Sequence, residues 1–233
     1  MQWKNRPNGL TWSGVIKNEE AKREAAARLA AELRDGQTVG IGSGSTSFLT
    51  LQALAARAEK EGLSFTAIPT SIEVANACAA LGLRTATLNE VRPDWCFDGA
   101  DEVDAKKRLI KGRGGALYRE KLMMAAAPKA FIVVDQSKIV DRLGQNFAAP
   151  VEIDPAALSL IFEQLQDFPG LDEVVLRPAG GKDGPVITER GNLTLDLTFS
   201  EIGDDAHTRL KQMSGVVETG LFFGYDFELV LAG

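Results

Sequence analysis

The chain has 233 residues, 45% of them hydrophobic, which allows one large domain, or one domain with a smaller satellite, around a sizeable core. Its 26 Lys and Arg residues against 32 Asp and Glu residues give a net charge of -6. That balance argues against a general electrostatic hold on nucleic acid or on an anionic membrane. Any anionic ligand must therefore be bound by a local site.

The cysteines and the N-terminal residues predict the compartment. Only Cys78 and Cys96 are present, far apart and without C-x-x-C spacing, so a disulfide framework is excluded and a reducing, cytoplasmic location is expected. The first fifteen residues contain no apolar run long enough for a signal peptide, and a stretch of about 18 consecutive apolar residues occurs nowhere. We expect no membrane partner and a loosely ordered N-terminal extension.

The first half of the sequence alternates strand and helix patterns. A stretch rich in Ala, Leu, Glu and Arg over residues 18–34 predicts a helix, with Asn18 as N-cap and Asp35-Gly36 as the stop. Short apolar runs then alternate with helical patterns, which indicates a parallel sheet. The expected strands cover residues 38–42, 65–69, 85–88, 94–97 and 130–134, and the further helices cover residues 45–60, 72–81 and 116–127.

After Pro150 the rhythm changes. The expected strands cover residues 151–153, 173–177, 185–188 and 192–198, the helices cover 155–166 and 206–213, and a final apolar stretch covers 220–231. This order resembles a split β-α-β, ferredoxin-like arrangement. The predicted fold class is α/β, a doubly wound, mainly parallel Rossmann-like sheet with a second, smaller α+β domain. We expect residues 1–148 and 219–233 to form the α/β domain and residues 149–218 the small domain.

The segment GIGSGST, residues 40–46, ends one of these strands and opens a helix. Its backbone N–H groups and hydroxyls can converge on an anion at the helix N-terminus. The dinucleotide fingerprint G-x-G-x-x-G fails, because a serine stands at the third glycine position whichever glycine begins the count. The acidic residue that would bind a ribose is also missing, since the second strand ends in Pro69-Thr70-Ser71. The segment predicts a phosphate site, with a simple tight turn as the alternative.

Four acids follow the next apolar strand in the segment DGADEVD, residues 98–104. Ligands of open α/β sheets bind just beyond the carboxyl ends of the strands. A solvated acidic loop is the alternative, but Asp98 directly follows Trp95-Cys96-Phe97 and should be partly buried. The spacing of a calcium loop is absent.

Two further polar segments contain lysines. In KGRGGALYREK, residues 111–121, a basic, glycine-rich loop opens a helix whose second turn carries Glu120. Taken alone, Glu120 is also explained as a surface acid between two basic neighbours. Lys138, after the apolar run 131–134, is either an anion ligand or a solvated lysine.

All four polar segments follow apolar strands, and in a parallel sheet such strand ends share one edge, so we expect the segments to meet in one cleft. His207 is the only histidine and lies on a predicted amphipathic helix in the second half, which argues against histidine-based acid–base or triad chemistry. A plausible set of His or Cys ligands for zinc is absent from the sequence. We therefore expect neither a metal nor a cofactor.

The motifs GIGSGST, DGADEVD, KGRGGAL-Y-REK and VVDQSK, in this order and roughly this spacing, resemble the A-type ribose-5-phosphate isomerase family. The resemblance extends from Lys22 to the closing GVVETGLF at residues 215–222. It implies interconversion of ribose 5-phosphate and ribulose 5-phosphate through an enediolate, in the non-oxidative pentose phosphate pathway. It also implies no cofactor, a small sugar phosphate as the partner, and a homodimer or homotetramer.

The resemblance also implies roles for individual residues. Glu120 would be the base, Lys111 would stabilise the enediolate, and Asp98 or Asp101 would handle hydroxyl protons, with the two aspartates not assigned separately. The phosphate would be bound by Ser43, Gly44, Ser45 and Thr46, with Lys22 assisting. The other implied substrate contacts are Gly99, Ala100, Gly112, Arg113, Gly114 and Lys138. Arg113 stands where many members of the family have glycine, and Ser43 where many have threonine.

Two other functions remain open from the sequence. A sugar-phosphate sensing domain would not need Glu120 and would normally carry a DNA-binding module, but no convincing helix-turn-helix precedes residue 37. An amino-sugar phosphate deaminase or a coenzyme A transferase would share the architecture and should show different site motifs.

Overall fold

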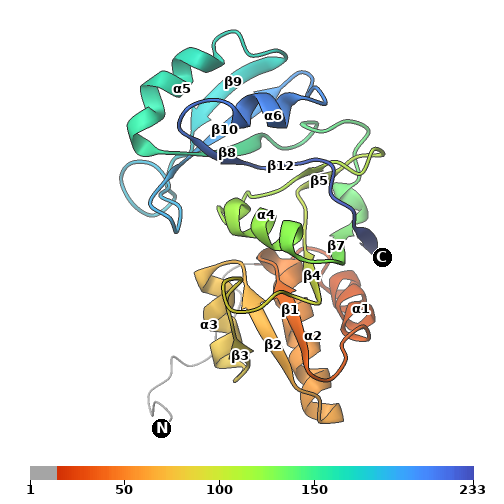
Figure 1. Ribbon diagram of the computed structural model, residues 1–233. Helices are drawn as coiled ribbons and strands as arrows, with labels where there is room; N and C mark the ends of the chain where they lie inside the picture. The colour runs from red at the N-terminus through yellow and green to blue at the C-terminus, as the bar shows by residue number, and fades with distance from the viewer. Residues whose placement is uncertain (1–14) are drawn as a thin grey trace. The chain divides into compact units, whose positions relative to one another are not determined.

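The computed structural model describes residues 15–233 (Figure 1), so the expected N-terminal extension lies, apart from Val15, outside the described residues. Contacts divide the chain into two compact units. Unit 1 contains the residues up to Gly99 together with Met123–Gln136 and Asp226–Gly233, and unit 2 contains Ala100–Leu122 and Ser137–Tyr225. This division by contacts differs from the expected one, in which residues 149–218 form the small domain. The expected domain boundaries stay a prediction. Within residues 15–233, no helix is long and apolar enough to cross a bilayer.

Unit 1 contains a six-stranded, wholly parallel sheet with the strand order β13-β7-β4-β1-β2-β3. When the strands of this sheet are numbered along the chain, their order is 6-5-4-1-2-3, as in a Rossmann-like sheet. The strand order reverses between β1 and β4. The predicted fold class is confirmed. The strands are β1 (Gln37–Ile41), β2 (Phe65–Pro69), β3 (Arg84–Thr85), β4 (Trp95–Asp98), β7 (Ala130–Asp135) and β13 (Glu228–Ala232).

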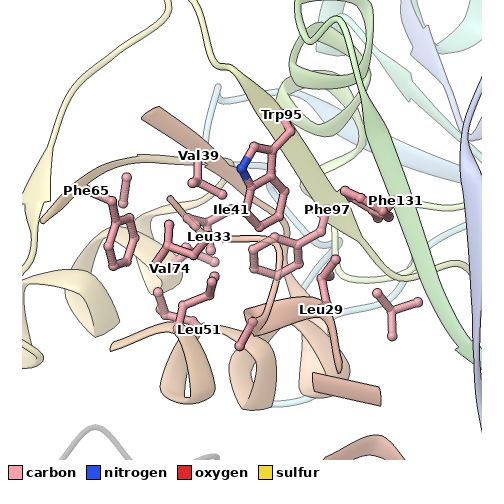
Figure 2. Close-up of a cluster of buried hydrophobic side chains, with 14 of the residues drawn as sticks. Leu29, Leu33, Val39, Ile41, Leu51, Phe65, Val74, Trp95, Phe97 and Phe131 are labelled. Carbon is pink, nitrogen blue, oxygen red and sulfur yellow. The ribbon is translucent and has the colours of Figure 1, made fainter. Parts of the chain in front are cut away.

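Helices cover both faces of this sheet. On one face, side chains of α1 (Glu19–Ala30), α2 (Gly44–Glu61) and α3 (Ile72–Ala80) join the sheet in one buried cluster, part of which Figure 2 shows. Burying one such Leu or Phe contributes roughly 1.5–3 kcal/mol. Because side chains alternate along a strand, Gly40 faces away from this cluster, where an added Cβ would lie 2.3 Å from Sδ of Met123. Met123 belongs to α4 (Leu117–Ala126), so the sheet is covered from both sides.

Unit 2 contains a second sheet with the chain order β-α-β-β-α-β. Its four strands pair antiparallel in the order β11-β8-β10-β9, so the predicted ferredoxin-like arrangement is confirmed. The helices and strands are β8 (Ala149–Ile153), α5 (Leu158–Leu165), β9 (Leu171–Leu176), β10 (Leu193–Phe199), α6 (Ala206–Lys211) and β11 (Val216–Thr219).

A third, small sheet in unit 2 pairs β5 (Glu102–Val103), β6 (Leu109–Ile110) and β12 (Leu221–Phe222) in the antiparallel order β12-β6-β5. Its inward side chains, Ile110 and Leu221, join the buried cluster of the four-stranded sheet. Short 3-10 turns cover Gln136–Lys138 and Pro155–Ala157.

Several expected elements differ from those of the structure. The first helix ends at Ala30 instead of residue 34, and Asn18 has φ 54° and makes no side-chain capping bond. The strand expected at residues 85–88 is reduced to Arg84–Thr85, an exposed pair at the sheet edge. The strand expected at residues 185–188 is replaced by isolated bridges, because Pro185 lacks a backbone N–H for a ladder. The apolar stretch 220–231 forms two strands, β12 and β13, in different sheets.

Candidate active site

The glycine-rich segment 40–46 lies in unit 1 where the strand order reverses, the place where open α/β sheets bind ligands. The Gly42 N–H donates to the Phe97 carbonyl at 2.9 Å, and a Cβ on Gly42 would lie 2.3 Å from Cγ of Asp98. Only glycine admits the Asp98 carboxyl there. That buried carboxyl accepts hydrogen bonds from Ser47 Oγ at 3.4 Å and from the Gly99 N–H at 2.8 Å. Asp98 is thus fixed against the start of α2.

The first turn of α2 presents the predicted phosphate-binding residues. Ser43 is the N-cap in an extended conformation, and Gly44 has φ +88°, a conformation that favours glycine. The N–H groups of this turn have no partner within the helix, as at any helix start. Lys22 of α1 is buried, with Nζ 3.5 Å from Ser45 Oγ and 3.8 Å from Asp135 Oδ2. A cation, hydroxyls and a helix N-terminus therefore come together within unit 1.

In unit 2 a lysine and a carboxylate are paired in the interior. Lys111 Nζ lies 3.3 Å from Glu120 Oε2, and the two side chains are only 4% and 5% exposed. Glu120 is therefore not the surface acid that its basic neighbours suggest. An ion pair in such a dry environment interacts far more strongly than one in water.

Half-buried Asp101 lies in the same cluster of charged groups. Burial raises the pKa of its carboxyl, and the charge of Glu120 acts in the same direction, while Lys111, Lys138 and a hydrogen bond from the Arg113 N–H oppose the rise. The N–H of Arg113 lies 3.3 Å from Asp101 Oδ2. The structure thus groups Asp101, Lys111, Arg113, Glu120 and Lys138 in unit 2.

The loop after β6 explains how Glu120 faces inward. Gly112 has φ +94°, and a Cβ there would lie 2.4 Å from Cβ of Leu117, so the loop packs directly on the first turn of α4. Glu120 then lies in the next part of that helix, beside Lys111. The expectation that Lys111 follows a strand of the parallel sheet is wrong, because β6 belongs to the small antiparallel sheet.

Sequence reasoning gave no role to Glu102 and Phe147, which support the cations of the cluster. Lys138 Nζ lies 4.5 Å from the centroid of the Phe147 ring, and the Arg113 guanidinium carbon lies 5.3 Å from the same centroid. Each cation–aromatic contact contributes about 0.5–1 kcal/mol at an exposed site. Fully buried Glu102 fixes the loop of Phe147 by accepting hydrogen bonds at 2.5 to 3.0 Å from the N–H groups of Gly144, Asn146 and Phe147.

The remaining predicted site residues lie on the connecting segments. Gly99 and Ala100 are half-buried between β4 and β5, while Gly114 is exposed in the loop before α4. The union of the unit 1 and unit 2 groups in one cleft stays a prediction. Among residues 15–233, no three His, Cys, Asp or Glu side chains are arranged to hold a metal ion.

A Rossmann-like strand order, a helix start at the point where that order reverses and a buried Lys–Glu pair are features expected of an enzyme that binds an anionic substrate and transfers protons. The family model for ribose 5-phosphate isomerase A (phosphoriboisomerase A) matches residues 66–233. The chain belongs to this family.

Relatives agree over nearly the whole chain. The sequence is 40% identical to ribose-5-phosphate isomerase A of Methanothermobacter thermautotrophicus over 91% of this chain and 93% of that protein. It is 42% identical to the Synechococcus enzyme of the same name, over 91% and 92%. Among solved structures, ribose 5-phosphate isomerase A of Methanocaldococcus jannaschii superposes with a TM-score of 0.89 at 34% identity, covering 93% of this chain and 96% of that one. A D-ribose-5-phosphate isomerase in complex with phospho-erythronic acid gives a TM-score of 0.87 at 34% identity, with the same coverage.

Proposed function

We propose that the chain interconverts ribose 5-phosphate and ribulose 5-phosphate through an enediolate, with Glu120 as the base. The observation that carries this proposal is the buried pair of Glu120 and Lys111, 3.3 Å apart. Membership of the isomerase family and the likeness to a structure that binds phospho-erythronic acid support the choice of substrate.

The phosphate is assigned to the start of α2. The N–H groups of Gly44, Ser45 and Thr46, together with the partial positive charge of the helix N-terminus, favour a dianion. The ammonium of Lys22, 3.5 Å from Ser45 Oγ, adds a full positive charge. This binding is the same before and after the reaction, so it contributes to affinity and to orientation of the sugar.

The proton transfer is assigned to the cluster of unit 2. The Glu120 carboxylate removes the proton from C2, the C–H electron pair becomes the C1–C2 double bond, and the C1 carbonyl oxygen takes up the negative charge. Lys111 stabilises that charge. The Glu120 carboxyl, whose proton can exchange with solvent, then delivers a proton to C1. The C2 hydroxyl gives up its proton, so that its oxygen becomes the new carbonyl, and the C1 oxygen takes up a proton. Glu120 thereby acts as base and then as acid.

Protons must also move on and off the sugar oxygens, both in opening the furanose ring and in neutralising the enediolate. Asp101 suits this task, because burial raises the pKa of its carboxyl and so favours a form that donates a proton. Asp98 is the second carboxyl that the motif supplies, and it accepts hydrogen bonds from Ser47 Oγ and from the Gly99 N–H. We assign the donor role to Asp101 and leave Asp98 as the acceptor.

A sugar-phosphate sensing domain, the alternative from the class of binding modules, has no use for a buried Lys–Glu pair. Removing such charges from water costs several kcal/mol per ion, so a buried ion pair is weak evidence for a stabilising role. The pair therefore favours catalysis over binding alone.

The direct test is conversion of ribose 5-phosphate by the purified chain, dialysed against a chelator, in deuterated water. We expect ribulose 5-phosphate to form without added metal and deuterium to enter at the exchanging carbon. Absence of conversion would overturn the proposed function, and activity that returns only with a divalent ion would overturn the metal-free mechanism.

We also infer a cytoplasmic location and a homodimer or homotetramer. The location rests on Cys78 and Cys96, which are both buried and form no disulfide in the structure. The assembly rests on the resemblance to the family, and light scattering of the purified protein measures it.

A further inference from the structure

Lys121, the residue after the proposed base, is buried and makes several hydrogen bonds in unit 2. Its ammonium donates to Glu218 Oε1 at 3.0 Å, to the Thr219 carbonyl at 2.6 Å and to the Leu221 carbonyl at 2.9 Å. The ammonium also lies 4.6 Å from the centroid of the Phe222 ring. All of its donors are thus directed to the segment 218–222.

This arrangement is costly in itself. Burial lowers the pKa of the Lys121 ammonium to about 8, although the charge of Glu218 opposes the shift. A buried ion pair of this kind is often no more stabilising than well-packed apolar side chains of the same volume. A role in fixing geometry accounts for the lysine better than a role in stability does.

The same segment also holds Lys111. The Lys111 N–H donates to the Gly220 carbonyl at 2.9 Å, and β6 pairs with β12 through Ile110 and Leu221. A Cβ on Gly220 would lie 2.2 Å from the Lys111 carbonyl oxygen, so the two backbones are in close contact. The segment therefore binds the backbone of Lys111 and the side chain of Lys121 at once.

We propose that Lys121 is a positioning residue, whose ammonium ties α4 to the segment 218–222 and thereby fixes the Glu120 carboxylate against Lys111. The inference rests on the proposed role of Glu120 as the base. Lys121 itself donates to protein oxygens and takes no part in the proton transfer.

The first test is Lys121→Met, which keeps most of the length of the side chain and removes its three donors. A displacement of about 1 Å at a reacting group can cost on the order of 100-fold in rate, so we expect kcat to fall by about 10- to 100-fold while KM stays within about threefold. The matched control is Lys211→Met, because Lys211 also contacts Glu218, at 3.3 Å, from α6 and not from α4. This control should keep kcat within about twofold of the unaltered chain.

The second test combines the change with Glu120→Gln. If Lys121 acts through Glu120, Lys121→Met should change kcat by no more than about twofold once Glu120 is already glutamine. Equal losses in both backgrounds would show that Lys121 acts independently of Glu120 and would overturn the inference.

The outcomes separate the inference from the function on which it rests. Normal kcat in a folded Lys121→Met chain, with an impaired Glu120→Gln chain, overturns the positioning role alone. Normal kcat in Glu120→Gln overturns the assignment of the base. If circular dichroism shows that Lys121→Met does not fold, the double variant Lys121→Met with Glu218→Gln takes its place in both tests. This variant also removes the charge of the carboxylate that has lost Lys121, and Glu218→Gln alone is its reference.

Discussion

The two groups of candidate site residues differ in how the chain holds them. In unit 1 the proposed anion-binding groups are mainly N–H groups and hydroxyls on the first turn of α2, oriented by a local turn and ranging from exposed Gly44 to buried Thr46. In unit 2 the charged side chains of Lys111 and Glu120 are buried and held by contacts between distant segments. A local element suffices to bind a phosphate, whereas moving a proton from carbon requires charges removed from water, where their interaction is stronger.

The largest expected effect follows from Glu120→Gln, which keeps the shape of the side chain and removes the proton acceptor. A general base typically contributes about 10² to 10⁴-fold, so kcat should fall by at least about 100-fold with a modest change in KM. Exchange of the C2 proton with solvent deuterium should stop as well. The matched control is Glu189→Gln, which removes the carboxylate paired with the neighbouring Arg119 at 2.5 Å and should leave kcat near normal. Near-normal turnover in a folded Glu120→Gln chain would move the base to Asp98 or Asp101.

A binding effect of smaller size is expected from Ser45→Ala combined with Thr46→Ala. Losing a hydrogen bond to a charged group costs roughly 1.5–3 kcal/mol, so KM for ribose 5-phosphate should rise by about 10- to 150-fold with little change in kcat. Unphosphorylated ribose is the control substrate, and its slow turnover should be unaffected. An unchanged KM would place the phosphate elsewhere, with Lys138 as the next candidate. That result would contradict the division of roles in which unit 1 binds the phosphate and unit 2 transfers the proton.

The smallest expected effect is the contribution of His207 to the pH dependence of the unfolding free energy. Burial, together with the charge of Lys121, lowers the pKa of His207 to about 4, and its Nδ1 lies 2.8 Å from Thr219 Oγ1. Since the unfolded chain binds this proton more readily, the stabilisation present above pH 6.5 is lost as pH falls toward 4. His207 is half-buried, and with allowance for solvent screening we expect it to contribute about 1 kcal/mol of the loss in unfolding free energy between about pH 7 and 5.

Urea unfolding at both pH values measures this share. His207→Gln keeps a hydrogen-bonding side chain that does not titrate. Since His207 is the only histidine, the variant has no histidine that titrates in this pH range. The effects of the carboxylates, which both chains share, cancel in the comparison. The variant should lose less stability on acidification than the unaltered chain. The same pH dependence in both would show that His207 is not held neutral by the fold.

Much of unit 1 could be predicted from the sequence because its signals are local. A glycine-rich turn between an apolar run and a helical pattern predicts a strand end followed by a helix start, and in the structure β1 ends at Ile41 and α2 begins at Gly44. The alternation of strands and helices likewise predicts the parallel sheet, and the changed order after Pro150 predicts the ferredoxin-like unit. The roles of the individual site residues stay predictions.

The rest depends on contacts that a linear pattern does not show. Two-residue strands such as β5 and β6 have no periodicity, so the small sheet that carries Lys111 gave no signal. Glu120 and Lys121 read as ordinary helical surface charges, and only their distant partners, Lys111 and Glu218, account for their burial. Glu102 stands within the motif DGADEVD, but the loop whose N–H groups donate hydrogen bonds to it lies far along the chain.

The place of β13 in the sheet bears on synthesis of the protein. This strand, Glu228–Ala232, pairs with β7 and packs against α1, and Arg28 of that helix donates to the Leu231 carbonyl. A ribosome that has just finished β7 needs on the order of 10 s more to reach these residues. During that time the outer hydrogen-bonding groups of β7 have no neighbouring strand and can pair with another nascent chain. Translation that stalls between Ser137 and Tyr225 should therefore yield aggregation-prone fragments, even though most of the first sheet has already been made.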